Sequence, residues 1–421
     1  MLDRSECKKP AARASFRGVR CSKFRHVYGV PAKKDKCYDN IKITRNAHDS
    51  TFCAVNPKFL AVVVEVGGGG SFMVVPLDRP GRLDHNWSAR VTGHTGPVLD
   101  IKWNPFNDNI IASSSEDCSV RIWYVPDGQT LLEMSDSLVT LTGHRRKVGL
   151  IDWHPTADNV LASAAHDNMV MVWNVKKGEV ITSISCHPDT VHSLSWDRTG
   201  ARLVTTCKDR RLRLIDARTG SVSASGQGHA GGKASKVVWL EDKNLIFTTG
   251  FSKHSERQFA IWDPSNLSKP LKLETLDCSS GVLNPVYDPD TSMMYLIGRG
   301  DGNVRFYEIL PETPWVFYLS EFVSGTPHRS LAVLPKRGVD VMSCEVTRFF
   351  KLHTNRDMVE PISMVVPRKT DMFQDDLYPE TAAPIPALTG DIVLNSLYLL
   401  HSLHKQLFQL MNGSLARTRI Q

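Results

Sequence analysis

Several features of secreted, membrane and metal-binding proteins are missing from the sequence. The nine cysteines are scattered and never form a Cys-x-x-Cys pair, so neither a disulfide framework nor a zinc site is expected. The first twenty residues carry charges where a signal peptide needs an apolar run, and no apolar stretch has the length of a membrane span. We therefore expect a cytoplasmic protein whose contact with membranes is at most peripheral.

Catalytic and phosphate-binding motifs are missing as well. The sequence contains no HEXXH zinc motif, and the glycines from Gly67 to Gly70 lack the GK[ST] ending of a phosphate loop. These glycines are better explained as a hairpin turn. Adjacent carboxylates such as Asp375 and Asp376 fall in turn-like segments. We expect no enzymatic activity, no cofactor and no metal.

Positive charge is concentrated at the N-terminus. The chain has 421 residues and a net charge of +7, but residues 1–45 hold thirteen Lys and Arg against four Asp and Glu, a local +9. A basic segment of this kind suits an acidic partner surface. Basic and aromatic residues also alternate from Lys23 to Tyr28, as on a nucleic-acid platform. The same run fits a β-strand equally well, and without a nucleic-acid fold signal we expect no nucleic-acid partner.

An internal repeat determines the expected fold. Residues 93–123 align without a gap on residues 143–173 and match at thirteen of thirty-one positions. A weaker third copy follows, because the spacing of nine residues between His94 and Trp103 recurs from His187 to Trp196. Counting more divergent units, we find seven between about residues 40 and 366, each rich in β-branched residues and turns. Units of this length with four strands are propeller blades.

We therefore predict an all-β, seven-bladed WD-repeat β-propeller over residues 21–366. A flexible basic leader is expected at residues 1–20, a strap packed on the propeller at 367–388, and an atypical, helix-like tail at 389–421. A propeller must close its ring to protect its strand edges. We expect the strand at Phe24–Tyr28 to pair with the last blade after Ile362–Val366.

Polar residues recur at fixed places in the repeats. The recurring sets are His94, Ser113, Asp117 and Trp123; His144, Ser163, Asp167 and Trp173; and His187, Thr205 and Asp209. Histidine, serine and aspartate together suggest nucleophilic catalysis, but an active site needs one open set, whereas this set is repeated. We interpret the sets as buried hydrogen-bond networks that tie together the strands of each blade.

Longer runs resemble the coronin family of WD-repeat proteins. The similarity covers about residues 20–388 and is carried by SKFRHVYG (22–29), DSTFCAVNPKFLA (49–61), GHTGPVLDIKWNPFNDN (93–109), TTGFSKHSERQ (248–258), YDPDTSMMYL (287–296), LPKRGVDV (334–341) and VPRKTDMFQDDLYPET (366–381). The resemblance implies a seven-bladed propeller with a C-terminal strap. It also implies binding to filamentous actin as a regulator of the cytoskeleton.

The resemblance also suggests which residues contact actin. Basic residues near the N-terminus of coronins contact the acidic filament, and the matching position is Lys42, where many members have Arg. Arg25, Lys23 and Arg45 are further candidates because they are close in sequence. Other actin-regulatory proteins are additional expected partners.

The C-terminal residues depart from the coronin pattern. Residues 389–421 lack the usual ending with its coiled coil, so the sequence does not favour oligomerisation. A second interpretation is a WD-repeat scaffold that recruits proteins without binding actin.

Overall fold

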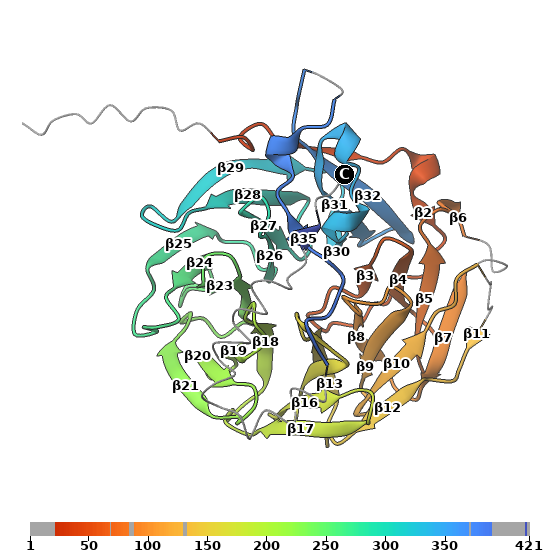
Figure 1. Cartoon of the computed structure of the whole chain (residues 1–421), viewed down its shortest axis with the longest axis vertical. Helices are drawn as coiled ribbons and strands as arrows, with labels where there is room; N and C mark the ends of the chain where they lie inside the picture. Colours follow the sequence, from red (N-terminus) through yellow and green to blue (C-terminus); the bar gives the residue numbers. More distant parts are fainter. Residues whose placement is uncertain are drawn as a thin grey trace, which may run out of the picture.

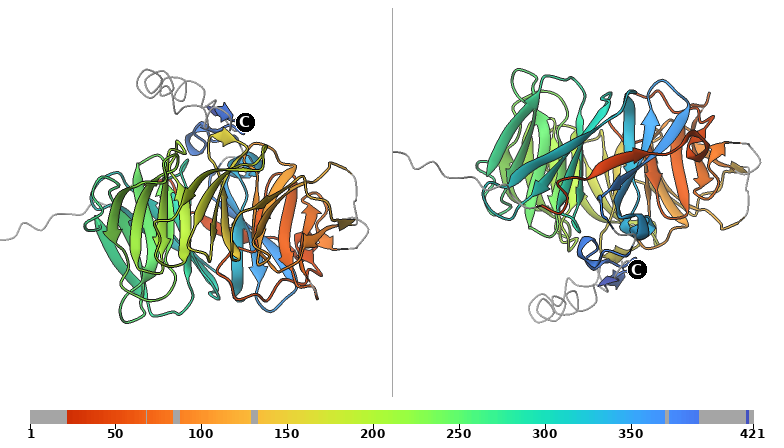
Figure 2. Two further views of the ribbon diagram at one scale, coloured as in Figure 1. Left: turned by 90° about the horizontal axis from the view of Figure 1, so that it is seen from below. Right: turned by 90° about the horizontal axis from the view of Figure 1, so that it is seen from above.

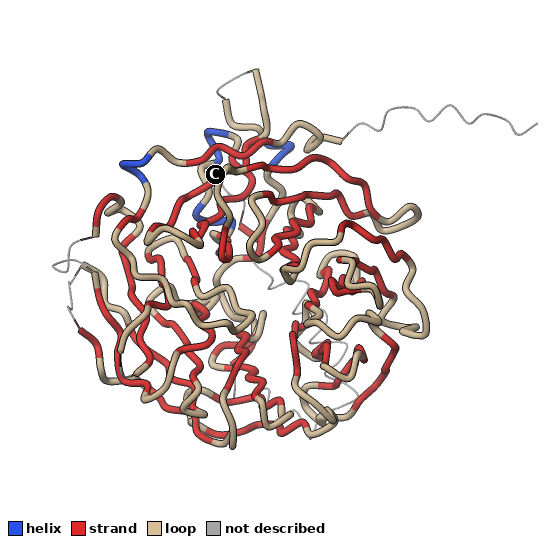
Figure 3. Tube along the Cα trace, turned by 180° about the vertical axis from the view of Figure 1, so that it is seen from behind, coloured by secondary structure: helices blue, strands red, loops and turns tan. Residues whose placement is uncertain are grey.

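Antiparallel strands make up nearly all the regular structure of the chain (Figure 3). The computed structural model describes residues 22–67, 69–83, 88–128, 133–369, 372–389 and 417–418. Within these residues, seven sheets of at least four strands are arranged as blades around a central axis (Figure 1). The predicted all-β, seven-bladed propeller is therefore confirmed.

In the first six blades the first strand lies near the axis and the fourth toward the rim, whereas in the seventh the N-terminal strands lie outside β32 (Met358–Val365), as Figure 1 shows. The first three blades are β3 (Cys53–Val55), β4 (Phe59–Val64), β5 (Gly70–Pro76) and β7 (Ala89–His94); β8 (Val98–Trp103), β9 (Ile110–Ser115), β10 (Ser119–Tyr124) and β12 (Val139–Thr142); and β13 (Val148–Trp153), β15 (Val160–Ala165), β16 (Val170–Asn174) and β17 (Glu179–Ile184).

The next four blades complete the circle. They are β18 (Val191–Trp196), β19 (Arg202–Cys207), β20 (Arg211–Asp216) and β21 (Val222–Gln227); β22 (Lys236–Leu240), β23 (Leu245–Phe251), β24 (Arg257–Trp262) and β25 (Lys272–Asp277); β26 (Leu283–Asp288), β27 (Met293–Gly298), β28 (Asn303–Ile309) and β29 (Val316–Val323); and β30 (His328–Val333), β31 (Glu345–His353) and β32 (Met358–Val365) with β1 (Tyr28–Pro31) and β2 (Tyr38–Asp39).

The remaining regular elements are short strands and 3-10 turns. The remaining strands are β6 (Gly81–Arg82), β11 (Glu133–Met134), β14 (Ala157–Asp158), β33 (Thr381–Ala382), β34 (Leu388–Thr389) and β35 (Arg417–Thr418). The 3-10 turns are η1 (Lys34–Lys36), η2 (Lys336–Gly338), η3 (Val341–Ser343) and η4 (Asp375–Leu377). Among the described residues, no helix is long and apolar enough to cross a membrane.

The apolar core lies between neighbouring blades. Strand β15 has the sequence Val-Leu-Ala-Ser-Ala-Ala, and all of its residues are buried because a blade stacks on each side of the sheet. Such strands are almost continuously apolar or small, since neither face meets water. Small side chains let adjacent blades approach closely, and the burial of these apolar surfaces is the main stabilising term.

The N-terminal strand closes the ring. Strand β1 is antiparallel to β32, with Tyr28 opposite Val365 and Pro31 opposite Ile362, so the predicted pairing of the two ends is confirmed. The strand begins later than Phe24, however. Phe24 is instead buried in a cluster that includes Leu377, because the chain turns there to pack against the strap. Closure leaves the seventh blade with both an early and a late part of the sequence.

The two flat faces of the disc are different (Figure 2). One face, here called the strap face, carries residues 367–369 and 372–389; on it β34 pairs in parallel with β14 of the third blade. The opposite face, here called the open face, carries the turns between the second and third strands of each blade and the segments that connect consecutive blades. The helix expected at residues 391–411 lies outside the described residues.

Candidate functional site

The polar set of the second blade forms a chain of hydrogen bonds. Nδ1 of His94 lies 2.8 Å from Asp117 Oδ2, and its Nε2 lies 2.8 Å from Ser113 Oγ. Trp123 donates its indole N–H to the same Ser113 oxygen at 2.8 Å. Because His94 ends the outer strand of the first blade, these hydrogen bonds connect the first blade to the second. Ser113 has 0% exposure, so its hydroxyl is out of reach of a substrate.

The electrostatics of this set favour a fixed charge on the aspartate. Burial alone would raise the pKa of Asp117, but hydrogen bonds from His94 and Ser119 outweigh it and hold this pKa well below its usual range. Asp117 also accepts a backbone N–H from Thr95 at 3.1 Å. The carboxylate is thus a structural acceptor whose hydrogen-bonding capacity is used inside the fold.

The third blade repeats the arrangement. His144 lies 3.1 Å from an oxygen of Asp167 and 2.7 Å from Ser163 Oγ, which also accepts the Trp173 N–H at 2.8 Å. Burial lowers the pKa of His144, although Asp167 opposes this effect. The imidazole is therefore held in its neutral form by its surroundings.

The fourth blade departs from the expected pairing. His187 lies 2.9 Å from Thr205 Oγ1, as its place in the repeat suggests. Asp209, however, pairs with the guanidinium of Arg213, whose Nη1 lies 3.1 Å from it. Arg213 is the stronger partner because its charge is permanent and its two N–H groups match the carboxylate. Here the expectation that His and Asp satisfy one another is wrong.

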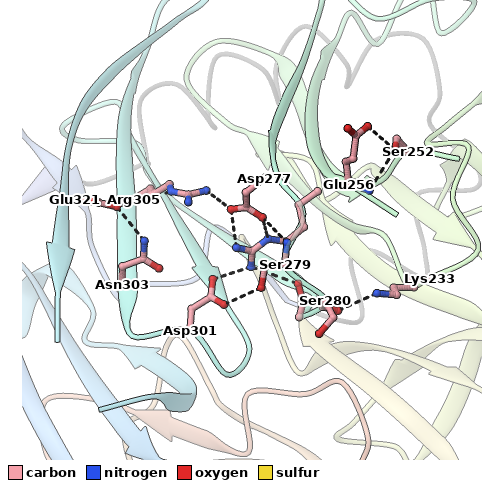
Figure 4. Close-up of polar contacts among 12 residues, drawn as sticks. Lys233, Ser252, Glu256, Asp277, Ser279, Ser280, Asp301, Asn303, Arg305 and Glu321 are labelled. Atoms are coloured by element: carbon pink, nitrogen blue, oxygen red, sulfur yellow. Dashed lines mark hydrogen bonds and ion pairs between the residues drawn. The ribbon is translucent and has the colours of Figure 1, made fainter. Parts of the chain in front are cut away.

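An ion network replaces the histidine at the boundary of the fifth and sixth blades (Figure 4). Arg257 donates to Asp277 at 2.6 Å and 2.7 Å and to Asp301 at 2.7 Å. Arg305 binds Asp277 from the other side at 2.6 Å. Burial opposes ionisation of Asp277, but the two arginines hold its pKa well below the usual range. Asp301 thus keeps its place in the repeat but takes its partner from the neighbouring blade.

Two of the four basic candidates lie together on the open face. Lys42 and Arg45 are exposed on the segment that enters the first blade. This segment is held by backbone bonds, because Glu65 N–H donates to the Lys42 carbonyl at 2.8 Å and Arg45 N–H donates to the Glu65 carboxylate at 2.8 Å. Both side chains therefore project from a fixed backbone.

The other two candidates lie at the opposite side of the disc. Lys23 donates to the Asp376 carbonyl at 2.8 Å and is thereby bound to the strap, and Arg25 is exposed beside it in sequence. After Arg25, strands β1 and β2 pair with opposite ends of β32. Strand β32 spans the thickness of the disc, which is roughly 23 Å for a strand of its length. Lys23 and Arg25 therefore do not share a surface with Lys42 and Arg45.

A third set of residues, which the sequence did not indicate, fixes the segment that follows Arg45. Arg299 of the sixth blade donates to Asp49 at 2.8 Å and to the carbonyl of Ala47 at 2.9 Å. Buried Lys236 of the fifth blade donates to the Asp49 carbonyl at 2.7 Å. These partners are 187 to 252 residues apart in the chain, so no local pattern could reveal them. Within the described residues, no cluster of three or more His, Cys, Asp or Glu could hold a metal.

Comparison with known proteins places this geometry in a family. Coronin-2B of Xenopus tropicalis is 54% identical over 371 residues, which cover 88% of this chain and 76% of that protein. The chain belongs to the coronin family. The WD40 domain of Toxoplasma gondii coronin has the same fold, with a TM-score of 0.83 and 33% identity over 87% of this chain and 94% of that one.

Models of several sequence families match consecutive parts of this coronin. Residues 17–82 match a domain of unknown function (DUF1899), and this part contains the closing strand and Lys42. Residues 87–124 match the WD domain, G-beta repeat; residues 136–197 match the anaphase-promoting complex subunit 4 WD40 domain; and residues 359–391 match a type of WD40 repeat that includes the strap. A chain of the mitotic checkpoint complex, at 16% identity and a TM-score of 0.60, shows the fold alone.

Proposed function

We propose that this coronin is a cytoplasmic, non-enzymatic regulator of the actin cytoskeleton that binds filamentous actin through its open face. The observation that carries the proposal is the exposed pair Lys42 and Arg45 on a segment whose backbone is bound to the first blade. Because the backbone is already ordered, binding an acidic surface costs the freedom of the side chains but little backbone freedom. Membership of the coronin family supports the choice of actin as the acidic partner.

The structure of the segment narrows the proposed contact. Lys42 and Arg45 share the open face, so a filament subunit can meet both at once. Lys23 and Arg25, near the strap, cannot join the same contact, and Lys23 is already bound to Asp376. We therefore assign the docking charge to Lys42 and Arg45 and remove Lys23 and Arg25 from the proposed site.

The substitution Lys42→Glu tests this assignment. Because it replaces an attraction by a repulsion at an exposed site, we expect filament affinity to fall about three- to tenfold in a co-sedimentation assay. Lys176→Glu is the matched control, since Lys176 is equally exposed but lies in a turn on the strap face. Equal pelleting of Lys42→Glu and wild type would refute the site, while leaving filament binding itself to be judged from the wild type.

The scaffold interpretation is the competing proposal, and the strap face favours it. Large apolar side chains are exposed there, including Met342 at 55%, Met372 at 75% and Ile385 at 63%. Apolar groups that gather on one face are typical of protein–protein contacts. Proteins retained from lysate should require actin filaments if the filament is the main partner. Retention that persists after filaments are removed would favour the scaffold.

A further inference from the structure

Seven exposed cations lie at the open-face ends of three consecutive blades, the third, fourth and fifth. This surface, here called the basic crescent, consists of Arg145, Arg146, Lys208, Arg210, Arg211, Lys233 and Lys253. They come from the connections that enter these blades and from the turns between their second and third strands. Because every blade of the ring places these loops on the same face, residues far apart in sequence gather on one surface.

The same loops carry four carboxylates, Asp167, Asp189, Asp209 and Glu256, against the seven cations of the crescent. Asp167 is bound by His144, Asp209 by Arg213 and Glu256 by Ser252. The neutral imidazole of His144 and the neutral hydroxyl of Ser252 leave the charges of Asp167 and Glu256 in place, whereas Arg213 neutralises Asp209. Asp189 forms an exposed pair with Lys208 at 3.4 Å, so the crescent's cations still outnumber the carboxylates of their loops.

Most of the crescent's charge is not compensated. Arg210 donates to the Ala230 carbonyl at 3.1 Å and Lys233 to the Ser280 carbonyl at 3.2 Å, and neutral acceptors leave both charges in place. Apart from Lys208, no member of the crescent forms a salt bridge with any residue that the structure describes. These exposed cations therefore remain available to a partner.

The half of the open face that holds Lys42 carries more carboxylates than cations. Its loops carry the cations Lys42, Arg45, Arg299 and Arg356 and the carboxylates Asp49, Glu65, Glu116, Asp117, Asp301 and Asp357. Arg299 is bound to Asp49 at 2.8 Å, a pair that cancels one charge of each sign and leaves the carboxylates in excess. An acidic body that approaches the open face therefore meets its strongest attraction over the crescent, across the disc from Lys42.

We propose that the basic crescent is a second contact with the acidic actin filament, so that the open face docks on it at two places. This inference rests on the proposed function and extends it to a surface outside the N-terminal segment. Both contacts lie on one face of a rigid ring, so one broad filament can engage both. Of the exposed large apolar side chains in the described residues, none lies in the crescent's loops, so this contact is electrostatic and weakens as salt rises.

The double variant R145E/R146E tests the crescent in a filament co-sedimentation assay. We expect about tenfold weaker binding than wild type at low salt, since two attractions become repulsions. The control K176E/K269E makes the same change of net charge on exposed residues of the strap face, and it should pellet like wild type. Circular dichroism melting curves of both variants should match that of wild type, because all four side chains are exposed.

The outcomes separate this inference from the proposed function. If R145E/R146E pellets like wild type while Lys42→Glu does not, the crescent is not a filament contact and only this inference fails. If wild type stays in the supernatant, both the function and the inference fail. If both double variants lose affinity equally, the effect is one of net charge, and a local contact at the crescent is again refuted. Loss of binding to phosphatidylserine vesicles with filament binding intact would also overturn it.

Discussion

At the scale of single residues, one serine hydroxyl is central to the network of the second blade and to that of the third. Ser113 Oγ accepts the Trp123 N–H and lies 2.8 Å from Nε2 of His94. The neighbouring Ser114 is equally buried, but its hydroxyl has no hydrogen-bond partner among the residues that the structure describes. The two adjacent serines therefore allow a matched comparison of a used and an unused hydroxyl.

We expect Ser113→Ala to lower the free energy of unfolding by about 1–3 kcal/mol, because it leaves a buried indole N–H without an acceptor. Ser114→Ala removes a hydroxyl that bonds to nothing and should change stability much less. Urea unfolding followed by tryptophan fluorescence measures both. Equal effects of the two substitutions would contradict the network interpretation.

Residue patterns predicted the repeated networks but not every partner. His94 and Asp117 could be paired from their recurrence, and the same logic paired His187 with Asp209. The second pairing is wrong because Asp209 binds the guanidinium of Arg213, on the strand that follows the turn, and not His187. Recurring residue types show which positions belong to a network. They do not show which side chains bind one another, because a nearby charged residue can bind the aspartate in place of the histidine.

At the scale of elements, the strap is held by the third blade. The Thr156 carbonyl accepts N–H groups of Ala387 at 2.9 Å and Leu388 at 3.2 Å. Thr156 is itself placed by His154, whose Nδ1 accepts the Thr156 N–H at 3.2 Å and whose Nε2 lies 3.1 Å from the Gly200 carbonyl. This pattern requires the neutral ring, with its proton on Nε2.

Acid should therefore weaken the anchor of the strap. Burial lowers the pKa of His154 from 6.5 to about 4, against the opposing effect of the Gly200 carbonyl. Since the folded pKa lies below the unfolded value, the unfolded chain binds the proton more readily. The stability due to neutral His154 is full above pH 6.5 and is lost as the pH falls toward 4.

The variant His154→Asn measures this contribution. We expect it to be less stable than wild type at neutral pH but to lose less stability between pH 6.5 and 4, in urea titrations at a series of pH values. His254→Asn, a change at an exposed histidine on the open face, should keep the wild-type slope. An unchanged slope in His154→Asn would show that this ring does not couple the fold to pH.

Element boundaries were less predictable than element types. The apolar and aromatic run from Phe24 to Tyr28 suggested the closing strand, whereas β1 covers Tyr28–Pro31. Phe24 and Val27 are buried for another reason, namely their packing in the same cluster as Leu377 of the strap. Apolar residues interspersed with basic ones occur in turns and in strands alike, so only the tertiary partner separates the two cases.

At the scale of the whole molecule, closure of the ring determines which charges share a face. Lys23 and Lys42 are close in sequence, yet β1 and β2 carry the chain from the strap face to the open face between them. Arg145 and Lys253 are distant in sequence, yet both belong to open-face loops. The repeat predicted the propeller, but the sequence alone could not assign its charges to faces.

The central claim is that the open face binds filamentous actin by electrostatic docking. Co-sedimentation of the wild-type chain with actin filaments over a salt series tests it most directly. We expect the protein to pellet at low salt and its affinity to fall steadily as salt shortens the range of the attraction to about 8–10 Å near physiological ionic strength. Wild-type protein that stays in the supernatant at low salt, or pellets equally at all salt concentrations, would contradict this account.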